Sequence, residues 1–167
     1  YCDVDYAVSF VGNEENQKVN LQAAREAMTL LKNDGALPLN PDAKQTILVC
    51  GPRAFDTDSL VGGWSSAQDG LTIADAVAAY AGESTTVLTE KEDVGVIKEL
   101  AQQADVIIVS IGEPSYQHDP VWGYDTLEIV QSQQEILEAA VASGKTVITV
   151  LCNGRPMAIP NAVERSD

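Results

Sequence analysis

Side chains able to bind or cleave a polar, uncharged ligand gather in three segments of the chain. The segment 51–71 contains Trp64, and the segment after Leu151 contains Asn153 and Arg155. The segment 112–131 contains the rest of the set, namely Glu113, His118, Asp119, Trp122, Tyr124 and Asp125. Indole rings suit the C–H face of a pyranose, while carboxylates and amides hydrogen-bond its hydroxyls. The combination favours a sugar ligand, although each residue alone could simply anchor or solvate a loop.

Four short apolar runs frame these segments, at residues 46–50, 85–88, 106–111 and 146–151. The uniformly apolar run at 46–50 is typical of a strand that is buried on both faces; the runs at 106–111 and 146–151 are strong, and the one at 85–88 is weaker. Helical patterns lie between them, which implies crossover connections and a mostly parallel sheet. The predicted fold class is α/β, a parallel-rich α/β sandwich with helices on both faces of the sheet.

Capping patterns predict where the helices begin. The expected starts are near Asn20, Asp93 and the capping-box pairs Thr72–Asp75 and Ser132–Glu135. An apolar stripe runs over residues 21–31, whereas residues 1–20 show no sustained period and are expected to be a connector. The helix after Thr72 is expected to bury Ile73, Val77 and Tyr80 on one face.

The connections 51–71 and 112–131 are far longer than the about two to six residues usual between a strand and the next helix. Each follows the carboxyl end of a predicted strand. Ligands of open α/β sheets bind outside that edge. The sequence therefore predicts a site there before any relative is considered.

Composition excludes several kinds of partner. The formal net charge of −15 repels phosphate backbones and anionic lipid, so we expect no nucleic-acid or membrane-surface role. No apolar run approaches the roughly 18 residues that span a bilayer, and no signal-peptide pattern opens the sequence. Cys2, Cys50 and Cys152 form no C-x-x-C pair, so no metal site is expected. Reduced thiols slightly favour a cytoplasmic location, with periplasmic or secreted ones left open.

Cofactor and nucleotide motifs are missing from the expected positions. The turn after the first apolar run reads CGPR at residues 50–53, which is neither G-x-G-x-x-G nor a P-loop. No G-x-S-x-G elbow accompanies His118. We expect no cofactor. Two alternatives stay open beside an enzyme: a non-catalytic carbohydrate-binding or scaffold module, and a flavodoxin-like nucleotide binder.

Five blocks, in order, resemble the second domain of family 3 glycoside hydrolases. They are AAREAMTLLKNDGALPL at 23–39, VCGP at 49–52, GGWS at 62–65, ADVIIVSIGE at 104–113 and NGRP at 153–156. The similarity extends from about residue 21 to the end and is closest to β-glucosidase-like and exo-glucohydrolase-like members.

The resemblance implies a retaining hydrolase whose aspartate nucleophile lies on an upstream (β/α)₈-like barrel. Residues 1–20 would then connect to that barrel, and residues 21–167 would form the α/β sandwich domain, truncated at its C-terminus. The implied partners are a carbohydrate substrate and the barrel domain of the same protein. Because the nucleophile would be absent, the isolated chain is expected to be inactive.

The resemblance also assigns site residues. Many members carry their acid/base in a glutamate-glycine-aromatic-aspartate-arginine stretch, but residues 122–126 read WGYDT here. In exo-glucohydrolase-like members the acid/base follows the third strand, which points to Glu113, with His118 as a second candidate. Glu113 could instead only brace its loop. The implied substrate-binding residues are Trp64, Trp122, Asp125 and Arg155.

Overall fold

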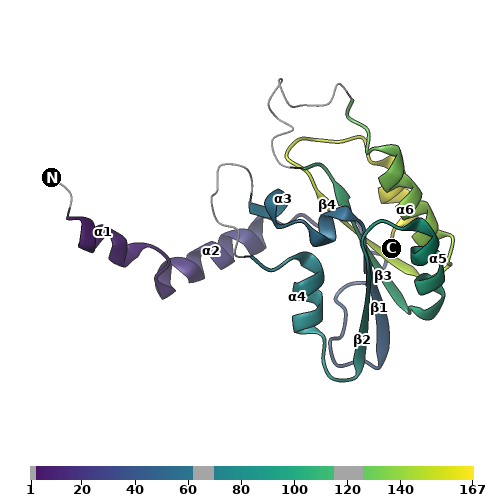
Figure 1. The fold of residues 1–167 in the computed structure, drawn as a ribbon, viewed down its shortest axis with the longest axis horizontal. Helices are drawn as coiled ribbons and strands as arrows, with labels where there is room; N and C mark the ends of the chain where they lie inside the picture. The colour runs from purple at the N-terminus through teal and green to yellow at the C-terminus, as the bar shows by residue number, and fades with distance from the viewer. Residues whose placement is uncertain (1–2, 62–69, 115–125) are drawn as a thin grey trace. The chain divides into compact units, whose positions relative to one another are not determined.

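The computed structural model describes residues 3–61, 70–114 and 126–167 (Figure 1). The chain divides into two compact units, Tyr1–Leu31 and Lys32–Asp167. Each unit is considered by itself.

The first unit contains helices α1 (Val4–Phe10) and α2 (Glu14–Ala27). Helix α2 begins after Asn13, whose side chain accepts a hydrogen bond from the Asn16 N–H at 2.8 Å. The helix predicted from residue 21 therefore starts earlier and ends at Ala27. Neither helix buries a residue, and α1 and the start of α2 occupy residues expected to be a connector without regular structure.

The second unit is built on a four-stranded parallel sheet of order β2-β1-β3-β4. Its strands are β1 (Gln45–Cys50), β2 (Thr85–Glu90), β3 (Val106–Gly112) and β4 (Thr146–Cys152). Every residue of β3 is buried, as its uninterrupted apolar run predicts. The predicted fold class is confirmed.

Helices cover both faces of this sheet (Figure 1). Helices α5 (Val94–Gln103), α6 (Gln131–Val141) and α7 (Pro160–Arg165) pack on one face. The 3₁₀ helix η1 (Pro52–Phe55) and α4 (Ile73–Tyr80) pack on the other, and α3 spans Thr57–Val61. Strand residues alternate between the two cores: Leu48 belongs to the first, and Ile47 and Val49 to the second.

The chain reverses its direction across the sheet between β1 and β3. From β1 it passes through α4 to β2, and from β2 it returns through α5 to β3 on the opposite side of β1. Opposite directions of right-handed crossover place α4 and α5 on opposite faces. The loops leaving β1 and β3 therefore diverge and open a crevice between their carboxyl ends.

Capping confirms some of the predicted helix starts. Thr72 and Asp75 form a capping box, and Asp93 accepts hydrogen bonds from the first N–H groups of α5. Ser132 does not cap α6, which begins at Gln131 with no side-chain cap bond. The side-chain carboxylate of Glu135 instead accepts a hydrogen bond from the side-chain amide of Gln131, at 3.1 Å.

Tyr80 corrects the predicted burial of α4. Ile73 and Val77 pack against the sheet as expected, but the Tyr80 side chain is 80% exposed. It stands at the last residue of the helix, beyond the reach of the apolar cluster.

Two glycines follow or end strands at points where the chain passes very close to the backbone of the neighbouring strand. Gly51, with φ of 95°, leaves β1 over Ser110, and Gly112, with φ of 139°, leaves β3 over Cys152. A Cβ atom would lie 2.2 Å from the Ser110 carbonyl oxygen at the first and 2.0 Å from the Cys152 carbonyl oxygen at the second. Only glycine fits either position.

Gly112→Ala should lower the free energy of unfolding by about 3 kcal/mol or more, because the new methyl group meets backbone as well as an unfavourable φ. Gly144→Ala is the matched control: Gly144 has φ of 71° but nothing within 4 Å of the added Cβ, so about 1 kcal/mol is expected. Urea unfolding of both variants measures the difference. Equal losses would show that the close approach to Cys152 costs nothing.

The Cys50 thiol links stability to pH. Burial, with a smaller contribution from the negative charge of Glu90, raises the pKa of Cys50 from 9.0 to about 12. The folded state thus keeps a proton that the unfolded state loses, and stability is complete below pH 9 and falls as pH rises towards 12. The slope contributed is about 1.4 kcal/mol per pH unit.

Cys50→Ala should therefore be less stable than the wild type at pH 8, because it leaves a small cavity, but should lose less stability between pH 9 and pH 10.5. Urea unfolding of both proteins at each pH tests this. Parallel pH profiles would mean that the thiol titrates alike in both states.

Candidate functional site

The crevice between β1 and β3 holds a cavity of about 120 Å³. Arg53, which follows β1, and Glu113, which follows β3, both line it. The remaining lining residues are Gly112, Pro114, Glu128, Val130, Gln133 and Met157. The charged lining therefore comes from segments that the chain reversal brings together at the carboxyl edge of the sheet.

Glu113 is the most unusual residue of this cavity, because it is a carboxylate only 5% exposed. Its Oε1 accepts a hydrogen bond from Nε of Arg155 at 2.7 Å and forms an ion pair with Nη2 of the same guanidinium, also at 2.7 Å. Its Oε2 is buried and has no hydrogen-bond partner among the described residues. A buried carboxylate oxygen is costly unless it is hydrogen-bonded, so Oε2 calls for an explanation.

Arg155 connects segments that are distant in the sequence. Besides Glu113, its Nη2 group donates to the Thr126 carbonyl oxygen at 2.7 Å. The Asn153 side chain in turn donates to the Arg155 carbonyl oxygen at 2.6 Å. The guanidinium thus bonds Glu113 and Thr126 of the protein itself. Its expected contact with substrate stays a prediction.

Gln133 is a site residue that the sequence did not single out. Its side chain, from α6, accepts from the Gly112 N–H at 2.7 Å and donates to the Gly112 carbonyl oxygen at 3.0 Å. A signal was present: Gln133 stands on the apolar stripe with Ile136, Leu137 and Ala140, where a polar side chain needs a buried partner.

Arg53 carries the positive charge on the β1 side of the cavity and forms an ion pair with Asp56. The nearby Cys152 is half-buried, and its Sγ lies 3.8 Å from Oγ of Ser110. Burial raises the pKa of the Cys152 thiol, while the Ser110 contact and the charge of Arg53 oppose that rise. Cys50 and Cys152 are both free thiols.

Most of the other predicted site residues lie outside the described residues. They are Trp64, His118, Asp119, Trp122, Tyr124 and Asp125. Their roles as sugar-stacking, hydroxyl-binding or acid/base groups remain predictions.

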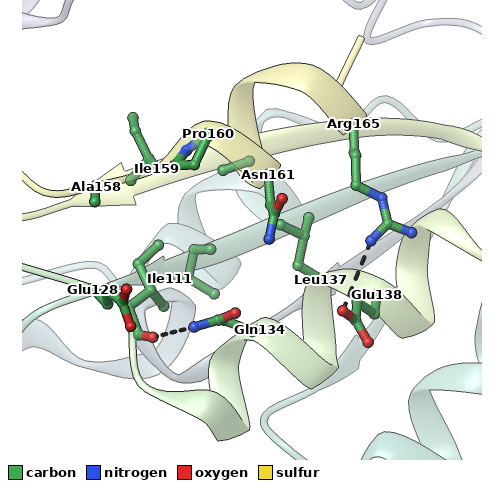
Figure 2. Close-up of a pocket in the computed structure, with 12 residues that line it drawn as sticks. Ile111, Glu128, Gln134, Leu137, Glu138, Ala158, Ile159, Pro160, Asn161 and Arg165 are labelled. Carbon is green, nitrogen blue, oxygen red and sulfur yellow. Dashed lines mark hydrogen bonds and ion pairs between the residues drawn. The ribbon is translucent and has the colours of Figure 1, made fainter.

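A second cavity, of about 150 Å³, lies between α6 and the segment leading into α7 (Figure 2). Ile111 and Leu137 supply its apolar wall, Arg165 stands 3.8 Å from Glu138, and Gln134 donates to the Ile129 carbonyl oxygen. Its Arg165 and Glu138 side chains are solvent-accessible and paired with each other, which makes it a weaker candidate than the Glu113 cavity.

Neither metal ligation nor membrane insertion has support in the part of the chain that the structure describes. It contains no group of three or more histidine, cysteine, aspartate or glutamate side chains placed to hold a metal ion. No helix in it combines the length and apolar character that crossing a bilayer requires.

Comparison with known proteins relates this chain to glycosidases. The chain is 28% identical to the periplasmic beta-glucosidase of Salmonella typhimurium, covering 91% of this chain and 24% of that protein. It is 30% identical to the lysosomal beta glucosidase of Dictyostelium discoideum, covering 92% and 21%. The chain thus spans about a quarter of the length of these relatives.

Solved structures agree. A β-glucosidase involved in saponin metabolism from intestinal bacteria superposes with a TM-score of 0.81 at 25% identity, over 95% of this chain and 27% of that one. The β-glucosidase from Listeria innocua in complex with glucose gives 0.77 at 26% identity, over 94% and 23%.

A family model describes the same region of the sequence. The glycosyl hydrolase family 3 C-terminal domain matches residues 28–167, which include the whole sheet and both sides of the Glu113 cavity. This chain therefore belongs to the C-terminal domain family of the family 3 glycosyl hydrolases.

Proposed function

We propose that the protein containing this chain hydrolyses O-glycosidic bonds of β-glucosides with retention of configuration. In this proposal the chain supplies the acid/base and the sugar-stacking side of the active site. One observation carries it: Glu113 stands at the switch point of the sheet with one oxygen bound by Arg155 and the other facing no hydrogen-bond partner among the described residues. Family membership supports the reaction class.

The proposed chemistry divides the work between two carboxyl groups about 5–5.5 Å apart. An aspartate of a barrel domain in the same protein attacks the anomeric carbon. Glu113 protonates the departing glycosidic oxygen through Oε2 and later accepts a proton from the water that releases the sugar. Arg155 holds Oε1 and thereby leaves Oε2 to face the substrate.

The remaining roles follow the predicted site residues. Trp64 and Trp122 stack on sugar rings, and Asp125 and Arg155 bind hydroxyl groups. His118 is the second candidate for the acid/base. The partners are the carbohydrate and the barrel domain, and the reaction as proposed uses no metal or cofactor.

Neither alternative gains support from the relatives. The strand order β2-β1-β3-β4 also occurs in flavodoxin-like folds, so the sheet alone does not separate a nucleotide binder from a glycosidase. The named relatives are glycosidases, some of them β-xylosidases, such as the one of Formosa agariphila. A β-xyloside therefore belongs beside the β-glucoside in every assay.

Glu113→Gln in the full-length enzyme should reduce disaccharide cleavage about 10²–10⁴-fold, because the leaving sugar is no longer protonated. Glutamine keeps an oxygen that can accept from Arg155, so the change removes the proton rather than the brace. An aryl glycoside with an acidic phenol should give a burst of phenol and then slow turnover, which azide partly restores. Stopped-flow absorbance measures the burst.

Glu138→Gln is the matched control, since Glu138 is an exposed glutamate of α6 whose only described ion pair is with Arg165. It should keep wild-type kinetics. Near-normal disaccharide cleavage by Glu113→Gln would place the acid elsewhere, and His118→Ala would then be the next variant. Equal losses of rate on the disaccharide and on the aryl glycoside, without rescue by azide, would mean that Glu113 only stabilises its loop.

The isolated chain should show no turnover of an aryl β-glucoside, because the nucleophile is on the barrel. Titration with glucose, followed by chemical-shift changes, should show millimolar binding at most. Robust turnover would contradict the division of the site between domains, and tight binding of a flavin or nucleotide would favour the nucleotide-binding alternative.

A further inference from the structure

Strand β3 continues beyond the reach of β1. The register between the two strands ends at the pair Cys50–Val109, where Gly51 leaves β1 over the backbone of Ser110, whereas β3 runs on to Gly112. From Ser110 onward β3 is paired with β4 alone. The final peptide groups of β3 are buried and need partners on the side that β1 has left.

The Gln133 side chain provides such partners to Gly112. Its carboxamide has the same donor and acceptor as a peptide group, and it bonds both the N–H and the carbonyl oxygen of Gly112, at 2.7 and 3.0 Å. Gln133 is 7% exposed, so water does not replace it easily. The Gln133 side chain of α6 therefore makes the two hydrogen bonds to Gly112 that a residue of a neighbouring strand would otherwise make.

The bond to the Gly112 carbonyl bears directly on Glu113. That carbonyl belongs to the peptide group whose N–H is the Glu113 N–H, and this N–H donates to the Cys152 carbonyl oxygen at 2.8 Å. The peptide plane is thus held at its oxygen by Gln133 and at its nitrogen by Cys152. Fixing this plane sets the direction in which the Glu113 side chain leaves the backbone.

We propose that Gln133 is a positioning residue for Glu113, acting through the Gly112–Glu113 peptide. The inference rests on the proposed function of Glu113. Three residues make up the buried polar and charged set of the described chain: Ser110, Glu113 and Gln133. All three lie at or against the end of β3. An apolar residue at position 133 would suit the buried face of α6 better than glutamine does, so the two bonds to Gly112 give a reason for a polar side chain there.

The test is a double-mutant cycle in the full-length enzyme. Gln133→Met keeps the length of the side chain and removes both bonds, and Gln133→Glu keeps an acceptor for the Gly112 N–H while it removes the donor to the Gly112 carbonyl. Each should lower kcat for a disaccharide by about 10²-fold, since a displacement of 1 Å is enough for such a loss. KM should change little, and the phenol burst from an activated aryl glycoside should survive.

In the Glu113→Gln background, Gln133→Met should cause little further loss, because residues that act as a unit are not additive. Gln134→Met is the matched control on the same helix. The Gln134 amide bonds the Ile129 carbonyl oxygen in the other cavity, so wild-type kcat is expected. Thermal melts of all variants report the folded fraction, and rates are compared per folded molecule.

The outcomes separate the two proposals. If Glu113→Gln loses disaccharide cleavage with the burst intact but the Gln133 losses are additive or equal on both substrates, Gln133 only stabilises the fold and the inference is wrong. If Glu113→Gln shows no dependence on the leaving group, the proposed function itself falls and the inference with it. Should Gln133→Met fail to fold, Gln133→Glu decides by the same criteria.

Discussion

The structure depends on how the buried end of β3 satisfies its backbone. Strand β3 is central and buried along its whole length, yet its neighbour β1 ends before it does. In a dry environment each N–H and carbonyl needs a partner, because leaving one without a bond costs as much as a lost hydrogen bond. Gln133 bonds both the N–H and the carbonyl oxygen of Gly112, and the Cys152 carbonyl oxygen of β4 accepts from the Glu113 N–H. This arrangement requires glycine at position 112, where the chain passes over the Cys152 carbonyl.

The carboxylate of Glu113 follows directly after this buried end of β3 and is itself buried. A charged group is retained at low exposure only if part of it is paired, and Arg155 pairs one oxygen of Glu113. Arg155 also binds the Thr126 carbonyl, so one guanidinium joins the exit of β3, residue 126 and the exit of β4. Rigidity of this kind is what a proton-transfer group needs, because its efficiency depends on the position of a single oxygen atom.

The fold alone does not distinguish a glycosidase domain from other doubly wound domains. The order β2-β1-β3-β4 opens its crevice between β1 and β3 whatever ligand binds there. Chemistry enters through the residues at that edge, here a buried carboxylate and a paired guanidinium rather than a glycine-rich phosphate loop. The acidic charge of the chain agrees with a neutral ligand and disfavours a phosphate-bearing one.

Local patterns in the sequence were enough to locate the four strands, because short runs of strand-forming residues alternate with helical stripes, although only β3 is buried along its whole length. The Thr72–Asp75 capping box was equally local and was confirmed. Resemblance to a family pointed to Glu113. By contrast, α1 and the first half of α2 were missed, because no sustained apolar period was found in residues 1–20 and the capping side chains of Asp3 and Asn13 were not recognised as helix starts.

Only the tertiary structure decided how the site is held together. Gln133 meets Gly112 across 21 residues, and Arg155 meets Glu113 across 42. No local propensity encodes such contacts, since they arise when crossovers bring α6 and the end of β4 to the exit of β3. The resemblance to the family predicts a substrate-binding role for Arg155, and only the structure shows that its guanidinium also bonds Glu113 and Thr126. The types of the chemical groups are thus written in the sequence, and their pairing follows from the path of the chain through the sheet.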